Sequence, residues 1–410
     1  MVKQSVLQMN GFFTRERFGK PQFFAGLLLL LFIAQCVWLI AHEPGAVVSP
    51  EEYGRVEEGL DQWHGTAVAG TPHGSAAAVE AVRMRGHAYD RDHSPLWYLT
   101  ETAPLAALRV GPDSRLWLWT SRAPYVLIGI LLGGSLWYVA RRLYGNAGGY
   151  VALALYCFSP AALRSSCLWF SSPNVAGAWG TFGAVFTAIA VAHTLYAPRE
   201  VVLWNWRRIL LLGVSLLVAI GSHFGLVIVL PLLLAYMLYL APERMPAACA
   251  ILAAAIGIGV FLMLASYFFR AALFWHGLGN ANWIDINARA FTMAGAYLQI
   301  GQEILAAGPA LVVLLPAALI TFAAWRRARY FGNSAALVLA VLFTVMRVGS
   351  PHEAESVFTL LAVLFFFVFI AGIAADLMES KAHELITAVI TGLVAANAVW
   401  NVIGLARIGR

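Results

Sequence analysis

Hydrophobic residues fill long blocks along most of this chain, and one polar stretch near the N-terminus interrupts them. Residues 22–41 form the first apolar block, which has the length of about 20 residues that one helix needs to cross a bilayer. Residues 43–121 are mostly polar, and this fifth of the chain holds 11 of its 21 Asp and Glu residues. The pattern predicts a membrane protein whose first loop, after its first span, gathers the acidic groups and therefore the chemistry.

Ten further apolar segments follow the polar stretch, so we expect about 11 transmembrane helices. The later segments lie at 123–140, 147–163, 173–196, 207–222, 224–241, 248–269, 305–325, 334–348, 356–376 and 384–405. Residues 207–241 are barely long enough for two helices, with the turn at Gly221, Ser222 and His223. The predicted fold class is therefore an all-α polytopic membrane protein.

Lys and Arg are unevenly divided between the short loops at the two ends of these spans. With the N-terminus inside, 14 of them fall on inside loops and six on short outside flanks, which is the bias expected of cytoplasmic loops. The bias predicts a cytoplasmic N-terminus and places residues 43–121 outside. A second outside segment, 271–302, is aromatic and semi-polar and is expected to form an interfacial helix or a lid over the first loop. A count of 10 or 12 spans stays open, because 11 leaves the basic C-terminal tail outside.

Composition supports one membrane-embedded domain over residues 1–410. The chain is 60% hydrophobic and only 12% charged, whereas a soluble domain is nearer half apolar and a quarter charged. The net charge of +6 is not accompanied by a basic patch with interleaved aromatic residues, so we predict no nucleic-acid partner. No Cys or His spacing typical of a metal site occurs, so no metal-ligating residues are predicted.

The polar loop contains signals for two surface helices. Ser49 and Pro50 suit the N-cap and the first helical position, and Glu52 completes a capping box with Ser49. Four apolar side chains then fall on one helical stripe: Tyr53, Val56, Leu60 and Trp63. The pattern predicts an amphipathic helix on the membrane surface or against the bundle, followed by a second helical stretch at about 75–85.

Several segments resemble motifs of the GT-C superfamily of glycosyltransferases, which includes protein mannosyltransferases, aminoarabinose transferases and RgtA/B/C/D-like proteins. Pro50-Glu51-Glu52-Tyr53 resembles the acidic start of the family's first outside loop, and Asp92-His93-Ser94-Pro95-Leu96 resembles its His-Pro-Pro-Leu element. Arg122 resembles the Arg ahead of the second span, and Arg347 lies where the family has a late outside loop ending in Arg-Tyr. The likeness covers most of residues 20–376 in layout. It departs from the family in its first acid, which is Glu51 in place of the usual Asp, and in its late Arg-Tyr, which is absent.

The resemblance implies a GT-C-like bundle whose donor is a sugar on a polyprenyl phosphate. A carboxylate must then take the proton of the acceptor, and cations at the membrane face must neutralise the departing phosphate. The resemblance gives Glu51 as the general base and Asp92 as the second acid of an inverting displacement. The predicted substrate-binding residues are Glu52, Tyr53, His93, Arg122 and Arg347. Alternatives stay open for each residue. Glu51 can instead be a first-turn carboxylate favoured by the helix dipole, and Glu52 a helix-capping residue. His93 can be an interfacial side chain, and Arg122 and Arg347 can be flanking residues at span ends.

The expected partners are membrane lipid, the lipid-linked donor, and a glycan, lipid or protein acceptor on the extracytoplasmic face. No cofactor is predicted, and the sequence does not decide for or against a divalent metal. We expect a bacterial inner membrane with the site on the periplasmic side. Two alternatives stay open: a transporter or flippase of a lipid-linked sugar, and a non-catalytic partner in polysaccharide assembly. Charges lie at the ends of the spans rather than in their middles, which favours the enzyme over the transporter.

Overall fold

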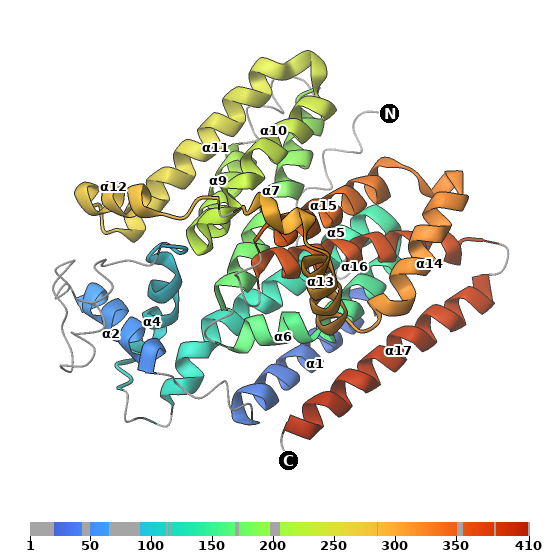
Figure 1. Ribbon diagram of the computed structural model, residues 1–410, viewed down its shortest axis with the longest axis horizontal. Coiled ribbons are helices and arrows are strands. Elements are labelled where there is room, and N and C mark those ends of the chain that lie inside the picture. The colour runs from blue at the N-terminus through green and yellow to red at the C-terminus, as the bar shows by residue number, and fades with distance from the viewer. Residues whose placement is uncertain are drawn as a thin grey trace.

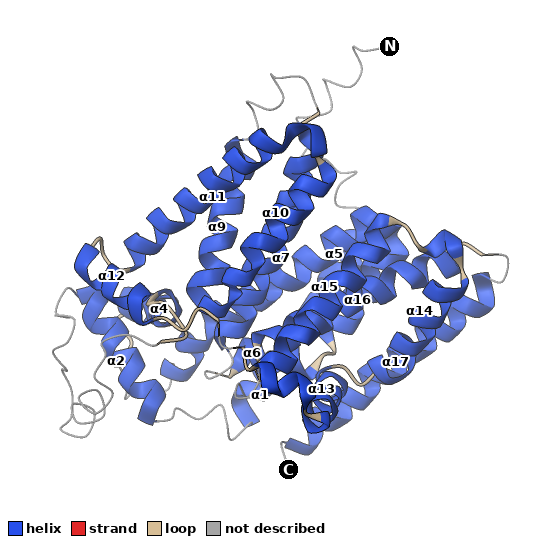
Figure 2. Ribbon diagram, turned by 45° about the horizontal axis from the view of Figure 1, so that its top comes forward, coloured by secondary structure: helices blue, strands red, loops and turns tan. Residues whose placement is uncertain are grey.

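The computed structural model describes residues 20–42, 50–64, 91–111, 114, 116–168, 172–196, 206–284, 286–350, 356–380 and 383–408. Over these residues the secondary structure is helical, with no strand (Figure 2). The helices of the N-terminal half are α1 Lys20–His42, α2 Pro50–His64, α4 Leu96–Leu108, α5 Trp117–Cys157, α6 Pro160–Cys167, α7 Ser172–Thr194 and α9 Trp206–Ser222. Those of the C-terminal half are η4 Phe224–Ile228, α10 Val229–Leu240, η5 Pro242–Arg244, α11 Met245–Ser266, α12 Ala271–Asn280, η6 Ala288–Thr292, α13 Ala294–Ala307, α14 Leu311–Ala324, η7 Arg326–Ala328, α15 Phe331–Gly349, α16 Val357–Met378 and α17 His383–Ile408. The predicted all-α membrane fold is therefore confirmed.

Apolar length identifies the membrane-spanning helices. Seven described helices are long and apolar enough to cross a bilayer, and the bent pair of α13 and α14 makes up to eight. The 41-residue α5 covers two of the predicted spans, and its backbone leaves helical geometry at Gly145, with φ 76° and ψ −172°. Only glycine adopts that conformation without strain, so α5 changes course there. The number of 11 spans stays a prediction.

Helix α16 forms the centre of the bundle. Its most apolar 18-residue window is completely buried, because Leu, Val, Ile and Phe cover all sides of the helix rather than one stripe. Helices α5, α7, α14 and α15 pack around it. In both views α9, α10 and α11 form one group of helices, and α14 and α17 lie on the other side of the bundle (Figures 1 and 2).

The structure has the turn predicted at 221–223 and a bend inside the span predicted at 305–325. The turn predicted at Gly221, Ser222 and His223 is confirmed, because α9 ends at Ser222 and His223 caps η4. Most of the span predicted at 305–325 is α14, but the structure adds a bend that was not predicted. Helices α13 and α14 meet there at a 106° bend, since Gly308 and Pro309 interrupt the apolar run.

The first loop forms a small helical layer at one end of the bundle. The predicted amphipathic helix is α2, and it packs on α4. Val56 of the predicted stripe is buried with Leu105 and Trp117, while Trp63 Nε1 donates to Leu99 O at 3.2 Å. The predicted helix at 75–85 and the Ser49 cap lie outside the described residues. Figure 1 shows α2, α4 and α12 gathered at this end of the molecule.

Candidate active site

Helix α4 organises the polar groups of the first loop. Ser94, just ahead of it, and Trp97, Tyr98, Glu101 and Leu105 are all buried. Because residues three and four apart share a helical face, Trp97 and Glu101 point to the same side of α4. On this face of α4, Trp97 lies beside His93, and Glu101 lies beside Arg122 near the start of α5.

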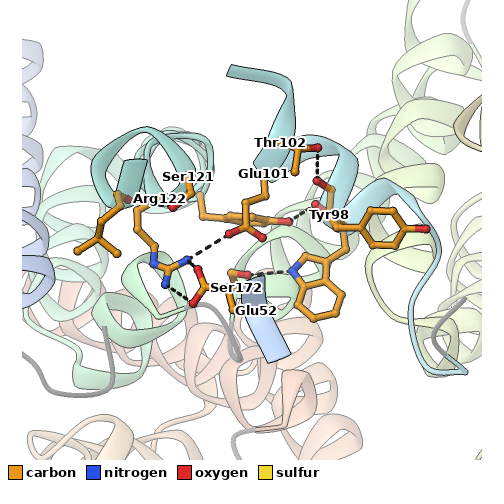
Figure 3. A network of polar contacts seen from close by, with 10 residues as sticks. Glu52, Tyr98, Glu101, Thr102, Ser121, Arg122 and Ser172 are labelled. Atoms are coloured by element: carbon orange, nitrogen blue, oxygen red, sulfur yellow. Dashed lines mark hydrogen bonds and ion pairs between the residues drawn. The ribbon is translucent and has the colours of Figure 1, made fainter. Parts of the chain in front are cut away.

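An ion-pair network lies at the end of that face (Figure 3). Arg122 of α5 donates from Nη2 to Glu52 Oε2 of α2 at 2.7 Å, and its Nη1 contacts both Glu52 Oε1 and Glu101 Oε1, the latter at 3.2 Å. The three side chains are between 0 and 2% exposed. The guanidinium thus holds Glu52 in a forked, two-point contact. It also ties together three helices that are distant in sequence.

Residues 91–94 are held against two other segments by backbone and side-chain contacts. Ser94 N and Oγ both donate to Gly221 O, at 3.0 and 2.7 Å, and Phe224 N donates to Asp92 O at 2.9 Å. The side chain of Asn282 donates to Asp92 Oδ1 at 3.2 Å. The predicted second outside segment, 271–302, therefore contacts the first loop directly at Asp92.

His93 lies in an aromatic cluster. Its ring centroid is 4.8 Å from that of Trp97 and 5.6 Å from that of His223, whose ring stands perpendicular to it. Trp97 Nε1 donates to Ser172 Oγ at 3.0 Å, at the first residue of α7. His223 Nδ1 accepts the Gly225 N–H at 3.1 Å, so a neutral His223 carries its proton on Nε2 and can donate to an acceptor there.

Arg347 forms a second buried ion pair at the end of α15. Its Nε and Nη2 donate to the two carboxylate oxygens of Glu303 on α13, at 2.9 and 2.6 Å. Thr359 of α16 donates to the same carboxylate at 3.1 Å, and Arg347 Nη1 donates to Ser350 O. The Arg347 side chain is 1% exposed, whereas that of Glu303 is 26% exposed.

A small cavity joins the two parts of the site. His223, Asn282, Met346, Ser350 and Phe358 line it, so it lies between the partners of Asp92 and His93 and the residue next to Arg347. Its volume of about 10 Å³ is room for about one water molecule. Asp92, His93 and Arg347 do not line this cavity themselves, but each contacts one residue that does: Asn282, His223 and Ser350, respectively.

The predicted site residues fall into three groups. Asp92, His93 and Arg347 each contact a residue that lines the cavity. Glu52 and Arg122 bind one another away from it. Glu51 and Tyr53 lie in α2, but their side chains are outside the described part of the chain.

The sequence interpretation missed three polar residues that contact the predicted ones. Glu101, Glu303 and Asn282 bind Arg122, Arg347 and Asp92, respectively. A single Glu inside the apolar sequence of α4 was the only available signal for Glu101. Within the described residues, His, Cys, Asp and Glu side chains form no group of three that could hold a metal ion.

No protein-family model and no curated protein matches the chain. Solved structures do. The oligosaccharyltransferase AglB from Archaeoglobus fulgidus, solved with an inhibitory peptide and a dolichol-phosphate, is similar over 93% of this chain with a TM-score of 0.57 and 11% identity. The same organism's oligosaccharyltransferase in the apo form gives a TM-score of 0.59 at 13% identity, again over 93% of this chain. The chain spans 56% of the length of either oligosaccharyltransferase chain.

ArnT from Cupriavidus metallidurans, solved with undecaprenyl phosphate, is also similar. The TM-score is 0.56 at 14% identity, and the match covers 92% of this chain and 70% of ArnT. At such identities the likeness shows the fold. The membrane fold expected from the resemblance is thus confirmed, and the chain shares this fold with the AglB oligosaccharyltransferase and with ArnT.

Proposed function

We propose that this chain is a membrane glycosyltransferase that moves a sugar from a polyprenyl-phosphate donor to an acceptor on the extracytoplasmic face. The carrying observation is that contact partners of Asp92, His93 and Arg347 line one small cavity in a chain with the fold of AglB and ArnT. Those proteins were solved with dolichol-phosphate and undecaprenyl phosphate, respectively, which supports a lipid phosphate as the donor here.

The proposed chemistry is an inverting displacement at the sugar carbon. Glu51, in the first turn of α2, takes the proton of the acceptor hydroxyl, and the acceptor oxygen bonds to the sugar while the bond to phosphate breaks. Asp92 is the second acid, oriented by Asn282. Tyr53 completes the acceptor side, next to Glu51 in sequence.

The cations stabilise the leaving phosphate. In this proposal His93 and Arg347 supply the positive charge, and His223, which lines the cavity beside His93, assists them. Arg122 and Glu52 contribute by fixing the first turn of α2, since Glu52 is held at both carboxylate oxygens. Lipid retention by Arg122→Ala tests whether Arg122 itself contacts the phosphate.

The proposed setting follows the distribution of charges. Residues 1–410 form one membrane-embedded unit with its N-terminus in the cytoplasm, and the loop 43–121 and the segment 271–302 meet on the periplasmic side of a bacterial inner membrane. The contact between Asn282 and Asp92 supports this shared face.

The test is mass spectrometry of lipids retained by the detergent-purified protein, for wild type beside Glu51→Gln, Glu58→Gln and Arg122→Ala. Glu58, also on α2, pairs with Arg55 and serves as the matched control. A polyprenyl-phosphate sugar enriched in Glu51→Gln but not in Glu58→Gln supports a transferase and names the sugar. Unchanged retention of that lipid by folded Arg122→Ala counts against a phosphate contact by Arg122. Equal retention by wild type and Glu51→Gln favours a carrier or a non-catalytic partner instead.

A further inference from the structure

An apolar groove lies on the membrane-facing side of the bundle, away from the candidate active site. Helices α5, α7 and α9 form its walls, and α1 adds Leu29. Its volume is about 760 Å³, within the range of about 300–1,000 Å³ that is typical of small-ligand pockets. Leu131, Phe186 and Val218 represent its mainly apolar lining.

One end of the groove is basic. Arg208, in the first turn of α9, lines it and donates from Nη1 to Ala190 O of α7 at 3.5 Å. Arg141 and Arg142 lie near the Gly145 break of α5, where the first half of that helix ends. The start of α9, where Arg207 and Arg208 lie, and the end of α7, at Ala190, therefore meet at the groove, and this end of it carries positive charge.

Polar and backbone contacts join the walls of the groove. Trp179 Nε1 of α7 donates to Ser135 Oγ of α5 at 3.3 Å, and both residues line the groove. Helix α7 approaches α9 closely at Gly180, where an added Cβ would lie 2.3 Å from Ala219 N. The wall between α7 and α9 is thus closed at the backbone, while the space between α7 and α5 is bridged by side chains.

We propose that this groove binds one acyl chain of an anionic phospholipid from the leaflet at the basic end, with the lipid phosphate at Arg208. An apolar trough open to the bilayer accepts a hydrocarbon chain without desolvating polar groups. A guanidinium offers five donors in a plane that matches phosphate. The further cations at the same end favour an anionic headgroup over a zwitterionic one.

Gly134 gives a direct way to fill the groove. It lines the groove, and a Cβ added there meets no heavy atom within 4 Å. The Cβ of a leucine at this position therefore meets open space, and we expect the rest of its side chain to occupy groove volume. Gly257 on α11 is the matched control, because its Cβ also meets nothing within 4 Å.

The charged end has an equally close control. Arg207 and Arg208 are neighbours on α9, but Arg207 lies over the ring of Trp206, 5.6 Å from its centroid, whereas Arg208 lines the groove. Arg207→Gln and Arg208→Gln change the net charge identically. A difference between them reports position rather than total charge.

The experiment measures the melting temperature of the full-length protein in detergent, with added phosphatidylglycerol or phosphatidylcholine of the same acyl chains. We expect phosphatidylglycerol to raise the melting temperature of wild type by about 5 °C when near-saturating, and phosphatidylcholine to raise it less. Gly134→Leu should lose the rise and Gly257→Leu should keep it. Arg208→Gln should lose the difference between the two lipids and Arg207→Gln should keep it.

Three results would overturn the proposal. A full rise in Gly134→Leu would show that the groove is not the site. Equal losses in Arg207→Gln and Arg208→Gln would show a general attraction to the basic face. Native mass spectrometry that finds polyprenyl phosphate, and no phospholipid, as the lipid displaced by Gly134→Leu would assign the groove to a different lipid. None of these readouts measures glycosyl transfer, so they do not depend on the proposed function.

Discussion

The buried Arg122 network makes a quantitative prediction for stability. Arg122→Met removes the guanidinium and keeps much of the side chain's apolar volume. It leaves Glu52 and Glu101, which are 1% and 0% exposed, buried without their shared cation. Breaking a buried ion pair by removing one partner costs about 3–5 kcal/mol, because the remaining charge is uncompensated. We therefore expect the free energy of unfolding to fall by about 3–5 kcal/mol.

An exposed ion pair supplies the control. Arg327 and Glu379 are 3.9 Å apart, and their side chains are 74% and 72% exposed. Exposed pairs contribute about 0–1 kcal/mol, so Arg327→Met should change stability little. The free energy is measured by reversible unfolding with SDS in mixed micelles, for both variants under the same conditions.

The double variant Glu52→Gln/Arg122→Met separates the ion pair from the loss of volume. Removing Glu52 as well takes away one of the two stranded charges, so the double variant should be more stable than the sum of the two single losses predicts, by about 1–3 kcal/mol. An Arg122→Met variant that unfolds as readily as Arg327→Met, or two losses that simply add, would refute the reasoning.

Two further predictions concern pH and packing. Burial, and then repulsion from Asp61, raise the pKa of the Glu57 carboxyl, so the folded state binds that proton more tightly than the unfolded state does, and this contribution to stability is present at low pH and lost as pH rises through the raised pKa. Glu57→Gln should therefore stabilise α2 at neutral pH and not below pH 4, as measured by protease protection of the first loop. A gain in protection that is independent of pH would contradict this prediction. Gly180→Ala should destabilise the protein by several kcal/mol, because its Cβ would lie 2.3 Å from Ala219 N and 2.7 Å from Ser215 O. Gly134→Ala should instead stabilise the protein by up to about 1 kcal/mol. Equal melting temperatures for the two variants would count against this close contact between α7 and α9.

The fold could be predicted because membrane spans are local in sequence. Apolar length alone located the central helix at 356–376, where the structure has α16 at Val357–Met378. Capping residues and one apolar stripe located α2. The 106° bend between α13 and α14 escaped because Leu, Val and Ala on both sides of Gly308 and Pro309 keep the hydropathy high, and hydropathy does not record direction.

The site was predicted less completely because its contacts are distant in sequence. Glu52 and Arg122 are 70 positions apart, and Glu303 and Arg347 are 44 apart. A motif can indicate that Arg122 and Arg347 matter, but no spacing indicates which carboxylate each one binds. Glu303 in particular lies in a segment whose other residues predicted only an interfacial helix or lid.

The two arginines are equally buried, but their carboxylate partners differ in exposure. The Arg122 and Arg347 side chains are 2% and 1% exposed, whereas their partners Glu52 and Glu303 are 2% and 26% exposed. A phosphate that approached Arg347 would also come close to the Glu303 carboxylate, and the two negative charges would repel each other. Glu303→Gln keeps a hydrogen-bond acceptor and removes the charge, so donor retention should rise several-fold if Arg347 binds the phosphate. Glu52→Gln should leave retention unchanged. If Glu303→Gln lowers retention, while the variant melts as wild type does, then Arg347 serves to hold α13 against α15 and the phosphate is bound elsewhere.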